Sequence, residues 1–255
     1  MKRTILSAIA ALLAASILGA DRSDALIGAD IADRSIHRYT VVVGSAKGRC
    51  TGVVLAQDIV LTAAHCIQTG EKLWVGGDQA PPGLLSAAGQ NGPQAVRPAQ
   101  LSAVDEIVQH PLFSRKDAGS PDLAMLKLAK PLPDRFIPAT LGARHLAEGD
   151  NLIAAGYGKA SADETRPPLV LRMVLLQVTR AVRGWAMLTA TSEDRAGGAP
   201  GDSGGPLFAY RGMHTLVGLI VSVSDKRTRA VALAAHYGWI KETQEKLSAT
   251  QVQGR

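Results

Sequence analysis

The sequence predicts an all-β protein, a sandwich or barrel made of many short strands. After residue 35 it consists largely of short apolar runs, several of them β-branched, separated by Gly, Pro, Asn and Asp. Strand-like and helix-like segments do not alternate, which disfavours a doubly wound α/β fold. With 255 residues, 46% of them hydrophobic and 20% charged, the chain can bury a substantial core.

The apolar runs give the expected strands in chain order. They cover residues 39–43, 52–55, 59–61, 73–75, 104–108, 123–128, 152–155, 170–178, 186–190, 206–210, 215–223 and 230–234. Residues 81–98, rich in Gly, Pro, Gln and Ala, indicate a long loop. The prolines between 131 and 138 indicate a bridge between two halves of the chain.

The end of the chain differs from the rest. Ile240 and Leu247 lie at a helical spacing among charged residues, so we expect a surface helix over residues 236–249. It is expected to pack through Tyr237, Trp239, Ile240 and Leu247.

The first 25 residues have the pattern of a secretory signal peptide. Lys2 and Arg3 precede an apolar run over 5–18, which is short for a membrane span, although an uncleaved anchor is the alternative. Cleavage after Ala25 is favoured. Cleavage after Ala20 would instead leave a short propeptide, residues 21–25. Either way we expect a secreted protein, extracellular or periplasmic, with no stable membrane span after cleavage.

The two cysteines fit an oxidising compartment. Cys50 and Cys66 are expected to pair. A disulfide that closes the loop between them stabilises the fold by about 3 kcal/mol in the chain-entropy model. Two buried free thiols are the alternative. Without a CxxC pair or a dense His/Cys cluster, we expect no metal and no cofactor. The net charge of +6 is scattered and not interleaved with aromatics, so no nucleic-acid partner is expected.

Three motifs carry candidate chemistry. In residues 201–207, glycines flank Ser203, which can expose its hydroxyl and leave backbone N–H groups beside it for an oxyanion. His65 ends an apolar run beside Cys66, a setting that would fix a general base. Asp122 heads another apolar run and could orient that histidine. The alternatives are a Gly-rich turn, a structural histidine and a strand cap.

Together, residues 61–66, 122–128 and 201–207 resemble the chymotrypsin-like (trypsin-fold) serine proteases, whose chain order is His, Asp, Ser. The resemblance implies two six-stranded antiparallel β-barrels, at about 26–135 and 136–235, with the C-terminal helix at 236–249 and the site between the barrels. It implies that Ser203 is the nucleophile, His65 the base and Asp122 its orienting acid.

The resemblance also assigns supporting roles. The N–H groups of Gly201 and Ser203 would form the oxyanion hole. Asp202, expected to be buried, would need a cation, which in this family is the α-ammonium of the mature N-terminus. Leu26 heads the segment that resembles that terminus, and cleavage after Ala25 would free it.

The residues expected to bind substrate depart from the family pattern. Gly197 lies at the position of the pocket base, so the counter-ion for Lys or Arg is missing. Ser222, Val223 and Ser224 resemble the strand that pairs with substrate backbone, and Thr228 lies near a pocket wall normally held by Gly. We therefore expect a shallow pocket for small or medium apolar side chains.

The sequence thus predicts a monomeric serine endopeptidase acting on protein or peptide substrates, with a protein inhibitor as a possible partner. A non-catalytic binding protein on the same fold is the alternative, although such relatives usually lack a triad member. An esterase of another superfamily is disfavoured. Residues 201–205 fit the Gly-x-Ser-x-Gly spacing, but the chain order of the triad differs. The natural substrate is not predicted.

Overall fold

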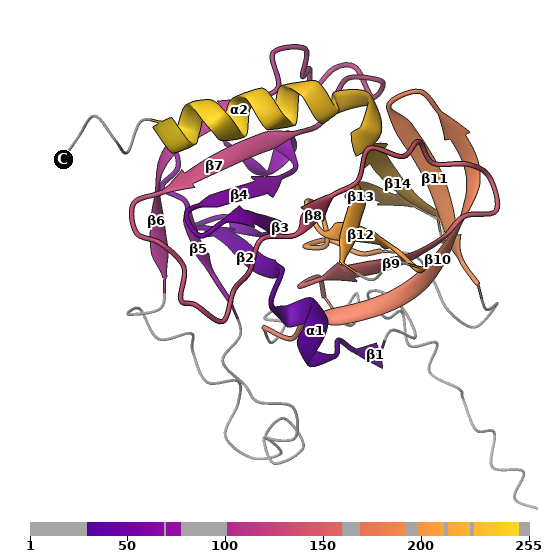
Figure 1. The fold of residues 1–255 in the computed structure, drawn as a ribbon, viewed down its shortest axis with the longest axis horizontal. Helices are drawn as coiled ribbons and strands as arrows, with labels where there is room; N and C mark the ends of the chain where they lie inside the picture. The colour runs from indigo at the N-terminus through magenta and orange to yellow at the C-terminus, as the bar shows by residue number, and fades with distance from the viewer. Residues whose placement is uncertain are drawn as a thin grey trace, which may run out of the picture.

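The computed structural model describes residues 30–68, 70–77, 101–159, 169–191, 198–211, 214–224 and 227–249. Two β-barrels lie side by side, and a long helix runs along one side of the molecule (Figure 1). The predicted signal peptide, the 81–98 loop, Leu26 and Gly197 lie outside the described residues.

The first barrel closes in the order β2-β3-β4-β7-β6-β5, and every pairing is antiparallel. Its strands are β2 (Thr40–Ser45), β3 (Gly48–Ala56), β4 (Ile59–Thr62), β5 (Trp74–Gly76), β6 (Ser102–Gln109) and β7 (Ala124–Leu128). Apart from β3 and β6, which carry exposed positions, these strands are almost wholly buried, as expected from their apolar sequences.

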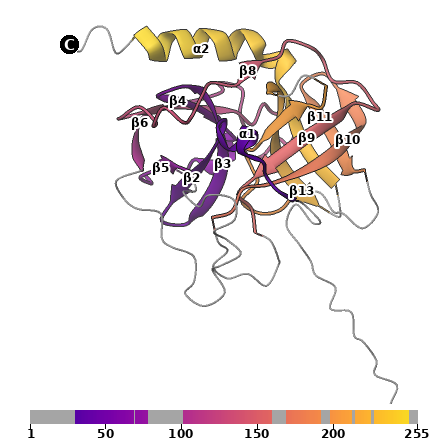
Figure 2. The same cartoon turned by 60° about the horizontal axis from the view of Figure 1, so that its bottom comes forward.

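The second barrel runs β10-β11-β14-β13-β12-β9 and is closed by pairing of β9 with β10. Its strands are β9 (Asn151–Gly156), β10 (Arg172–Val182), β11 (Trp185–Ala190), β12 (Pro206–Ala209), β13 (Thr215–Ser224) and β14 (Arg227–Ala232). Two short strands join it: β1 (Asp30–Ile31) on β10 and β8 (Thr140–Leu141) parallel to β13. The prediction of two six-stranded antiparallel barrels is confirmed (Figure 2).

Some local features differ from the prediction. The strand expected over 230–234 ends at Ala232, and Leu233–His236 form a 3₁₀ helix, η4, because an apolar run alone does not distinguish a strand from a buried helical turn. A short helix that was not predicted, α1 (Arg34–His37), follows Asp33. The Asp33 carboxylate accepts from the N–H groups of Ser35 and Ile36 at 2.7 and 3.2 Å.

The C-terminal helix α2 (Tyr237–Ala249) ties the end of the second barrel to the first. Its buried residues Ile240, Thr243 and Leu247 are three and four positions apart, as an amphipathic helix requires. Gln244 Nε2 donates to Leu55 O on β3 at 2.9 Å, and the helix lies above β4 and β7 in Figure 1. The expectation that Tyr237 packs inward is wrong, since this side chain is 37% exposed.

Three apolar clusters form the core. One fills the first barrel and includes Val41, Val75 and Leu126. Another fills the second barrel. The third contains residues from both barrels and α2, among them Val53, Phe208 and Ile240, all fully buried. This third cluster holds the barrels together and so fixes the position of any site between them.

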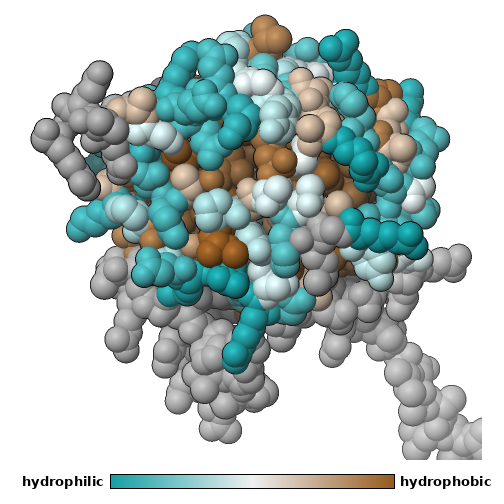
Figure 3. Space-filling model, viewed as in Figure 1, coloured by the Kyte–Doolittle hydropathy of each residue, from teal (hydrophilic) through white to brown (hydrophobic). Residues whose placement is uncertain are grey.

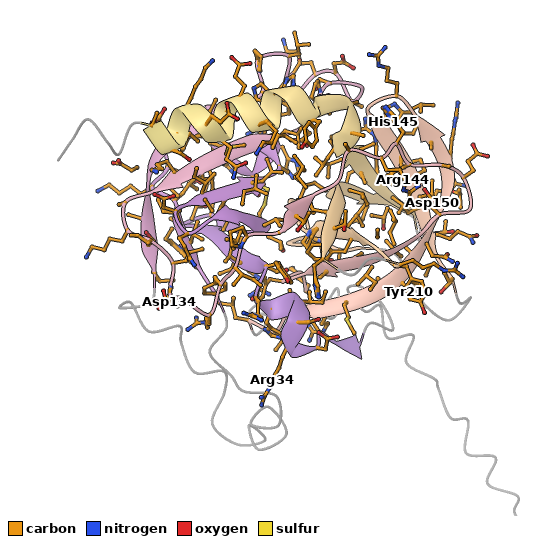
Figure 4. The ribbon with its side chains drawn as sticks, in the orientation of Figure 1. Arg34, Asp134, Arg144, His145, Asp150 and Tyr210 are labelled. Atoms are coloured by element: carbon orange, nitrogen blue, oxygen red, sulfur yellow. A yellow bond between two sulfur atoms is a disulfide. The ribbon has the colours of Figure 1, made fainter. Side chains whose placement is uncertain are left out.

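Outside the site, charged groups form ordinary structural pairs. Lys127 Nζ and Asp58 Oδ2 form an almost buried ion pair at 2.6 Å in the first barrel. Arg144 and Asp150 form a more exposed one at 2.7 Å on the second barrel, where Figure 4 labels both residues. Polar and apolar residues are interspersed on the face shown in Figure 3. No helix among the described residues is long and apolar enough to cross a membrane.

Candidate active site

His65 and Asp122 meet at the edge of the first barrel. His65 follows β4 and Asp122 precedes β7, and these strands pair with Thr62 opposite Ala124, which brings the two residues together. Asp122 accepts from the main-chain N–H of His65 at 2.8 Å, and its other oxygen lies 2.6 Å from His65 Nδ1. Because Nδ1 donates to the carboxylate, the neutral ring has its lone pair on Nε2, as a general base requires.

The disulfide predicted from the sequence is present, and the alternative of free thiols is wrong. Cys50 and Cys66 are bonded with their Cα atoms 6.2 Å apart, so β3 is joined to the residue after His65. Cys66 Sγ lies 3.8 Å from His65 Nε2 and 3.9 Å from Ser203 O, which places both candidate residues around one sulfur. Cys50, His65 and Cys66 gather three possible metal ligands, but the bonded sulfurs offer no thiolate.

The loop that carries Ser203 is shaped by two glycines in the left-handed region, Gly201 with φ of 105° and Gly204 with φ of 80°. The N–H groups of Asp202, Gly204 and Gly205 donate to main-chain carbonyls at 2.7–2.9 Å. Within the described part of the chain, the N–H groups of Gly201 and Ser203 donate to no acceptor. Two adjacent donors beside a serine hydroxyl can bind an oxyanion.

Thr51 on β3 fastens this loop to the first barrel. Its N–H donates to Ser203 O at 2.8 Å, and its hydroxyl donates to Gly201 O at 2.8 Å while accepting from Tyr157 N–H at 3.0 Å. A Cβ on Gly204 would lie 2.2 Å from Thr51 O, so only glycine fits there. Sequence reasoning missed Thr51, and its position next to Cys50 was the only signal.

Asp202 is fully buried beside Ser203, as predicted. Its carboxylate accepts from the N–H groups of Gly158 and Ala199 at 2.8 and 2.7 Å. Burial raises the pKa of Asp202 to about 6, and these hydrogen bonds and the charges of Arg172 and Arg49 only partly oppose that rise. The carboxylate therefore lacks full charge compensation from the described residues.

Glycines make room for the Asp202 side chain. A Cβ on Gly156 would lie 2.1 Å from Asp202 Oδ1, and one on Gly158 would lie 2.5 Å from the same atom. The two glycines flank Tyr157 in the sequence. Their physical role is to let the backbone approach a buried carboxylate closely.

Strand β13 extends beyond its neighbour β12 and has an open edge. The pairing of β12 with β13 ends at Leu219 of β13. On its other side, β13 stays paired with β14, with Ser222 opposite Arg229 and Ser224 opposite Arg227. Among the described residues, no strand covers the other edge of 222–224. An extended peptide can add to such an edge by main-chain hydrogen bonds.

Two of the predicted substrate-binding residues, Val223 on β13 and Thr228 opposite it on β14, lie together near Gly198. Thr228 is fully buried, and its hydroxyl accepts from Gly198 N–H at 2.9 Å. A Cβ on Gly198 would lie 2.7 Å from Val223 Cγ1. Ser222 is exposed, and the Ser224 backbone ends β13. The space next to Gly198 is therefore already occupied by Val223 and Thr228.

Solved structures share this two-barrel architecture. Neuropsin, a serine protease expressed in the limbic system of mouse brain, superposes with a TM-score of 0.65 at 20% identity, over 85% of this chain and 98% of that one. A structure titled "Structure of GrC" gives 0.68 at 22% identity, over 86% and 99%. These matches define the fold class as that of the two-barrel serine proteases.

The sequence matches the Trypsin family over residues 27–238, so the chain belongs to the trypsin family. Vitamin K-dependent protein C of Rattus norvegicus is 30% identical over 197 residues, which are 68% of this chain and 40% of that protein. Kallikrein 1-related peptidase b8 of Mus musculus is 27% identical over 217 residues, 77% of this chain and 81% of that protein. The chain thus spans only about two-fifths of protein C.

Proposed function

We propose that this protein is a serine endopeptidase that hydrolyses peptide bonds through an acyl-enzyme intermediate. Ser203 Oγ attacks the scissile carbonyl carbon, and His65 Nε2 takes its proton. His65 then protonates the leaving amine, which departs as the acyl-enzyme forms. A water molecule attacks the acyl-enzyme with the same histidine as base, which releases the acid product and restores Ser203.

One observation carries this proposal: Asp122 binds both the ring and the main chain of His65, at 2.6 and 2.8 Å. The double attachment fixes the position of the ring as well as its tautomer, and a carboxylate that merely capped β7 would need neither bond. The negative charge also stabilises the imidazolium that forms when Ser203 loses its proton.

The loop geometry supports the oxyanion role of Gly201 and Ser203. Their N–H groups have no acceptor among the described residues, and Thr51 fixes both carbonyls of this turn from the first barrel. Donors that are held in place before the reaction stabilise the developing charge without reorganisation. Removing one such donor typically lowers kcat about 10²–10³-fold.

The position of β1 supports an activating ion pair between Asp202 and the α-ammonium of Leu26. Ile31 on β1 pairs with Arg172 on β10, and Arg172 pairs with Gly156, which lies against Asp202. Leu26 lies four positions before Asp30, a length of chain that reaches up to about 14 Å. A free amino group at Leu26 would supply the charge that Asp202 lacks.

The filled space beside Gly198 supports a preference for small or medium apolar side chains at the cleaved residue. Val223 and Thr228 occupy space next to Gly198, and the acid described there, Asp202, already accepts from the N–H groups of Gly158 and Ala199. Cleavage of a peptide library tests this preference. Strong selectivity for Arg or Lys would contradict it.

A phosphonyl serine reagent tests the catalytic proposal directly. We expect stoichiometric labelling and peptide cleavage by the wild-type chain, and loss of both in Ser203→Ala. Asp150→Asn, in an exposed ion pair remote from the motif residues, is the control. A folded wild-type chain that binds peptides but is not labelled would favour the alternative of a non-catalytic binding protein.

We also propose that the protein is secreted and that signal peptidase itself frees Leu26. N-terminal sequencing of the exported protein tests this step. A start at Leu26 in active protein supports it. A start at Asp21 in fully active protein would show that neither cleavage after Ala25 nor a free Leu26 is required.

A further inference from the structure

Arg172, the first residue of β10, has an unsatisfied buried group. Its Nη1 atom is shielded from solvent and has no hydrogen-bond partner among the described residues. A buried donor without an acceptor costs roughly 1–3 kcal/mol, and more when it is charged, so it calls for an explanation. The mechanism proposed above does not use this side chain.

The strand register places Arg172 near the carboxylate of Asp202. Arg172 lies opposite Gly156 in the β9–β10 pair, and the backbone of Gly156 contacts Asp202 so closely that a Cβ would lie 2.1 Å from Oδ1. Arg172 and Arg49 both lower the pKa of Asp202, and the effect of Arg172 is the larger. A guanidinium with one unsatisfied nitrogen and an under-compensated acid therefore both lie next to Gly156.

Pairing these groups would remove two penalties at once. A buried carboxylate with only amide donors is costly, and an arginine stays protonated at any pH at which the protein is folded. The guanidinium has five N–H donors on a flexible stem, so the pairing that we infer needs a change of side-chain rotamer rather than of strand register. Asp202 precedes Ser203 directly, so its counter-ion stabilises the loop that holds the oxyanion donors.

We propose that Arg172 is a positioning residue, an internal counter-ion that holds Asp202 and the Ser203 loop in the catalytic arrangement without a free amino group at Leu26. The role rests on the proposed peptidase function and extends it to chains whose N-terminus is still covered. Arg172 and the Leu26 ammonium are then alternative partners of one carboxylate, and either suffices for activity.

A fusion protein with a removable carrier ahead of Leu26 tests the proposal in a single preparation. Before the carrier is cut off, Leu26 has no free ammonium; afterwards it does. Kcat and KM for a peptide amide substrate are measured in both states for wild type, Arg172→Gln and Arg172→Lys. Arg180→Gln is the matched control, since Arg180 lies on the same strand but over the Trp185 ring at 5.8 Å.

We expect the uncut wild type to retain kcat within about a hundredfold of the cut enzyme, roughly the effect of one oxyanion donor. Arg172→Gln should lower kcat of the uncut chain by about 10²-fold more with little change in KM, and cutting should restore it to within a few-fold of wild type. Arg172→Lys should keep most of the uncut activity. Arg180→Gln should change neither state.

Three results would overturn the role of Arg172: an inactive uncut wild type beside an active cut one, an equal loss in Arg172→Gln before and after cutting, or full uncut activity in Arg172→Gln. The first two would leave the peptidase proposal intact. If neither state of the wild type reacts with a phosphonyl reagent, the peptidase proposal itself fails, and this role fails with it.

A second measurement needs no catalysis and tests the ion pair if Arg172→Gln folds poorly. Melting temperatures of the uncut chain are compared for Arg172→Lys and wild type, each with Asp202 or with Asp202→Asn. We expect Arg172→Lys to lower the melting temperature only when Asp202 is present, because lysine lacks the planar fork that arginine offers a carboxylate. The same shift in both backgrounds would contradict a direct interaction.

Discussion

Asp122 and Asp202 are the two acids next to the proposed catalytic residues, one in each half of the molecule, and their partners differ. Asp122 receives the ring and the main-chain N–H of His65, a residue whose strand pairs with its own. Asp202 is fully buried, and the groups that donate to it within the described ranges are two main-chain N–H groups, so burial raises its pKa to about 6.

This difference distinguishes two halves of the proposed site. We call the half with His65 and Asp122 preassembled, and the half with Asp202 and Ser203 conditional. The His65–Asp122 pair needs nothing beyond the first barrel, since β4, β7 and the disulfide fix both residues. In the proposed mechanism, the loop of Ser203 instead depends on a cation for Asp202, either Arg172 or the Leu26 ammonium. Control of such an enzyme therefore acts on the oxyanion hole and nucleophile rather than on the base.

The largest effect is expected at the preassembled half. Asp122→Asn should lower kcat about 10⁴-fold while the fold is kept, because the amide favours the wrong histidine tautomer. Steady-state kinetics with a peptide amide, alongside Asp150→Asn, measure it. A loss of less than tenfold would mean that Asp122 only caps β7.

At the conditional half, Asp202→Asn should have opposite effects on activity and stability. The processed enzyme should lose about 10²–10³ in kcat, since the Ser203 loop loses its anchoring charge. An uncut Arg172→Gln chain at pH 7, which has neither of the proposed counter-ions, should instead gain about 3 kcal/mol from Asp202→Asn, because a carboxyl whose pKa rises from 3.8 to about 6 on folding is destabilising when ionised.

The pH dependence follows from the same shift. The folded pKa is raised, so the contribution of Asp202 to stability is fully present below pH 3.8 and is lost as the pH rises through 6. The advantage of Asp202→Asn in urea unfolding should therefore vanish near pH 4. An advantage that is equal at pH 4 and pH 7 would contradict the assignment to charge burial.

A smaller effect is expected where the two halves are joined. Thr51→Val keeps the N–H bond to Ser203 but removes the hydroxyl that links Gly201 and Tyr157, so kcat should fall about tenfold and stability by about 1–2 kcal/mol. Thr51→Ser should restore kcat. Thr40→Val is the control, since that buried hydroxyl donates to Ile36 O at 3.0 Å, away from the loop. Equal kcat losses in both valine variants would argue against a specific link.

The smallest effect concerns a second contact between the halves. His110 is 8% exposed, its ring lies 5.1 Å from that of His236 and 4.7 Å from that of Trp239, and burial followed by the charge of His236 lowers the pKa of His110. Unfolded histidine takes up a proton near pH 6.5, so this contact should stabilise the fold above that pH and weaken as the pH falls below it.

Urea unfolding at pH 7.5 and pH 5 of wild type and His110→Gln measures this contribution. We expect the free energy of unfolding of wild type, taken relative to that of His110→Gln, to be lower at pH 5 than at pH 7.5. His145→Gln, at an exposed position labelled in Figure 4, should show no such shift. A shift of the same size in both variants would assign the effect to net charge.

Much of this arrangement could be predicted from the sequence. Runs of apolar residues marked nearly every strand, and the order of His65, Asp122 and Ser203 predicted which segments meet. The contacts of Thr51 and the proposed role of Arg172 were not predictable, because both depend on strand register: the inference about Arg172 rests on its position opposite Gly156. Propensity and periodicity specify elements, whereas register between distant strands is decided by the packing of the whole barrel.

The open edge of β13 has a consequence for what can be cut. If substrates bind by adding a strand along 222–224, the target must offer several residues in extended form with their main-chain N–H and C=O groups unpaired. A helix or an inner strand has none to offer. The backbone conformation of the target would then decide where it can be cut before its side chains do. In a folded target protein we therefore expect the first cuts, identified by mass spectrometry, to fall in loops.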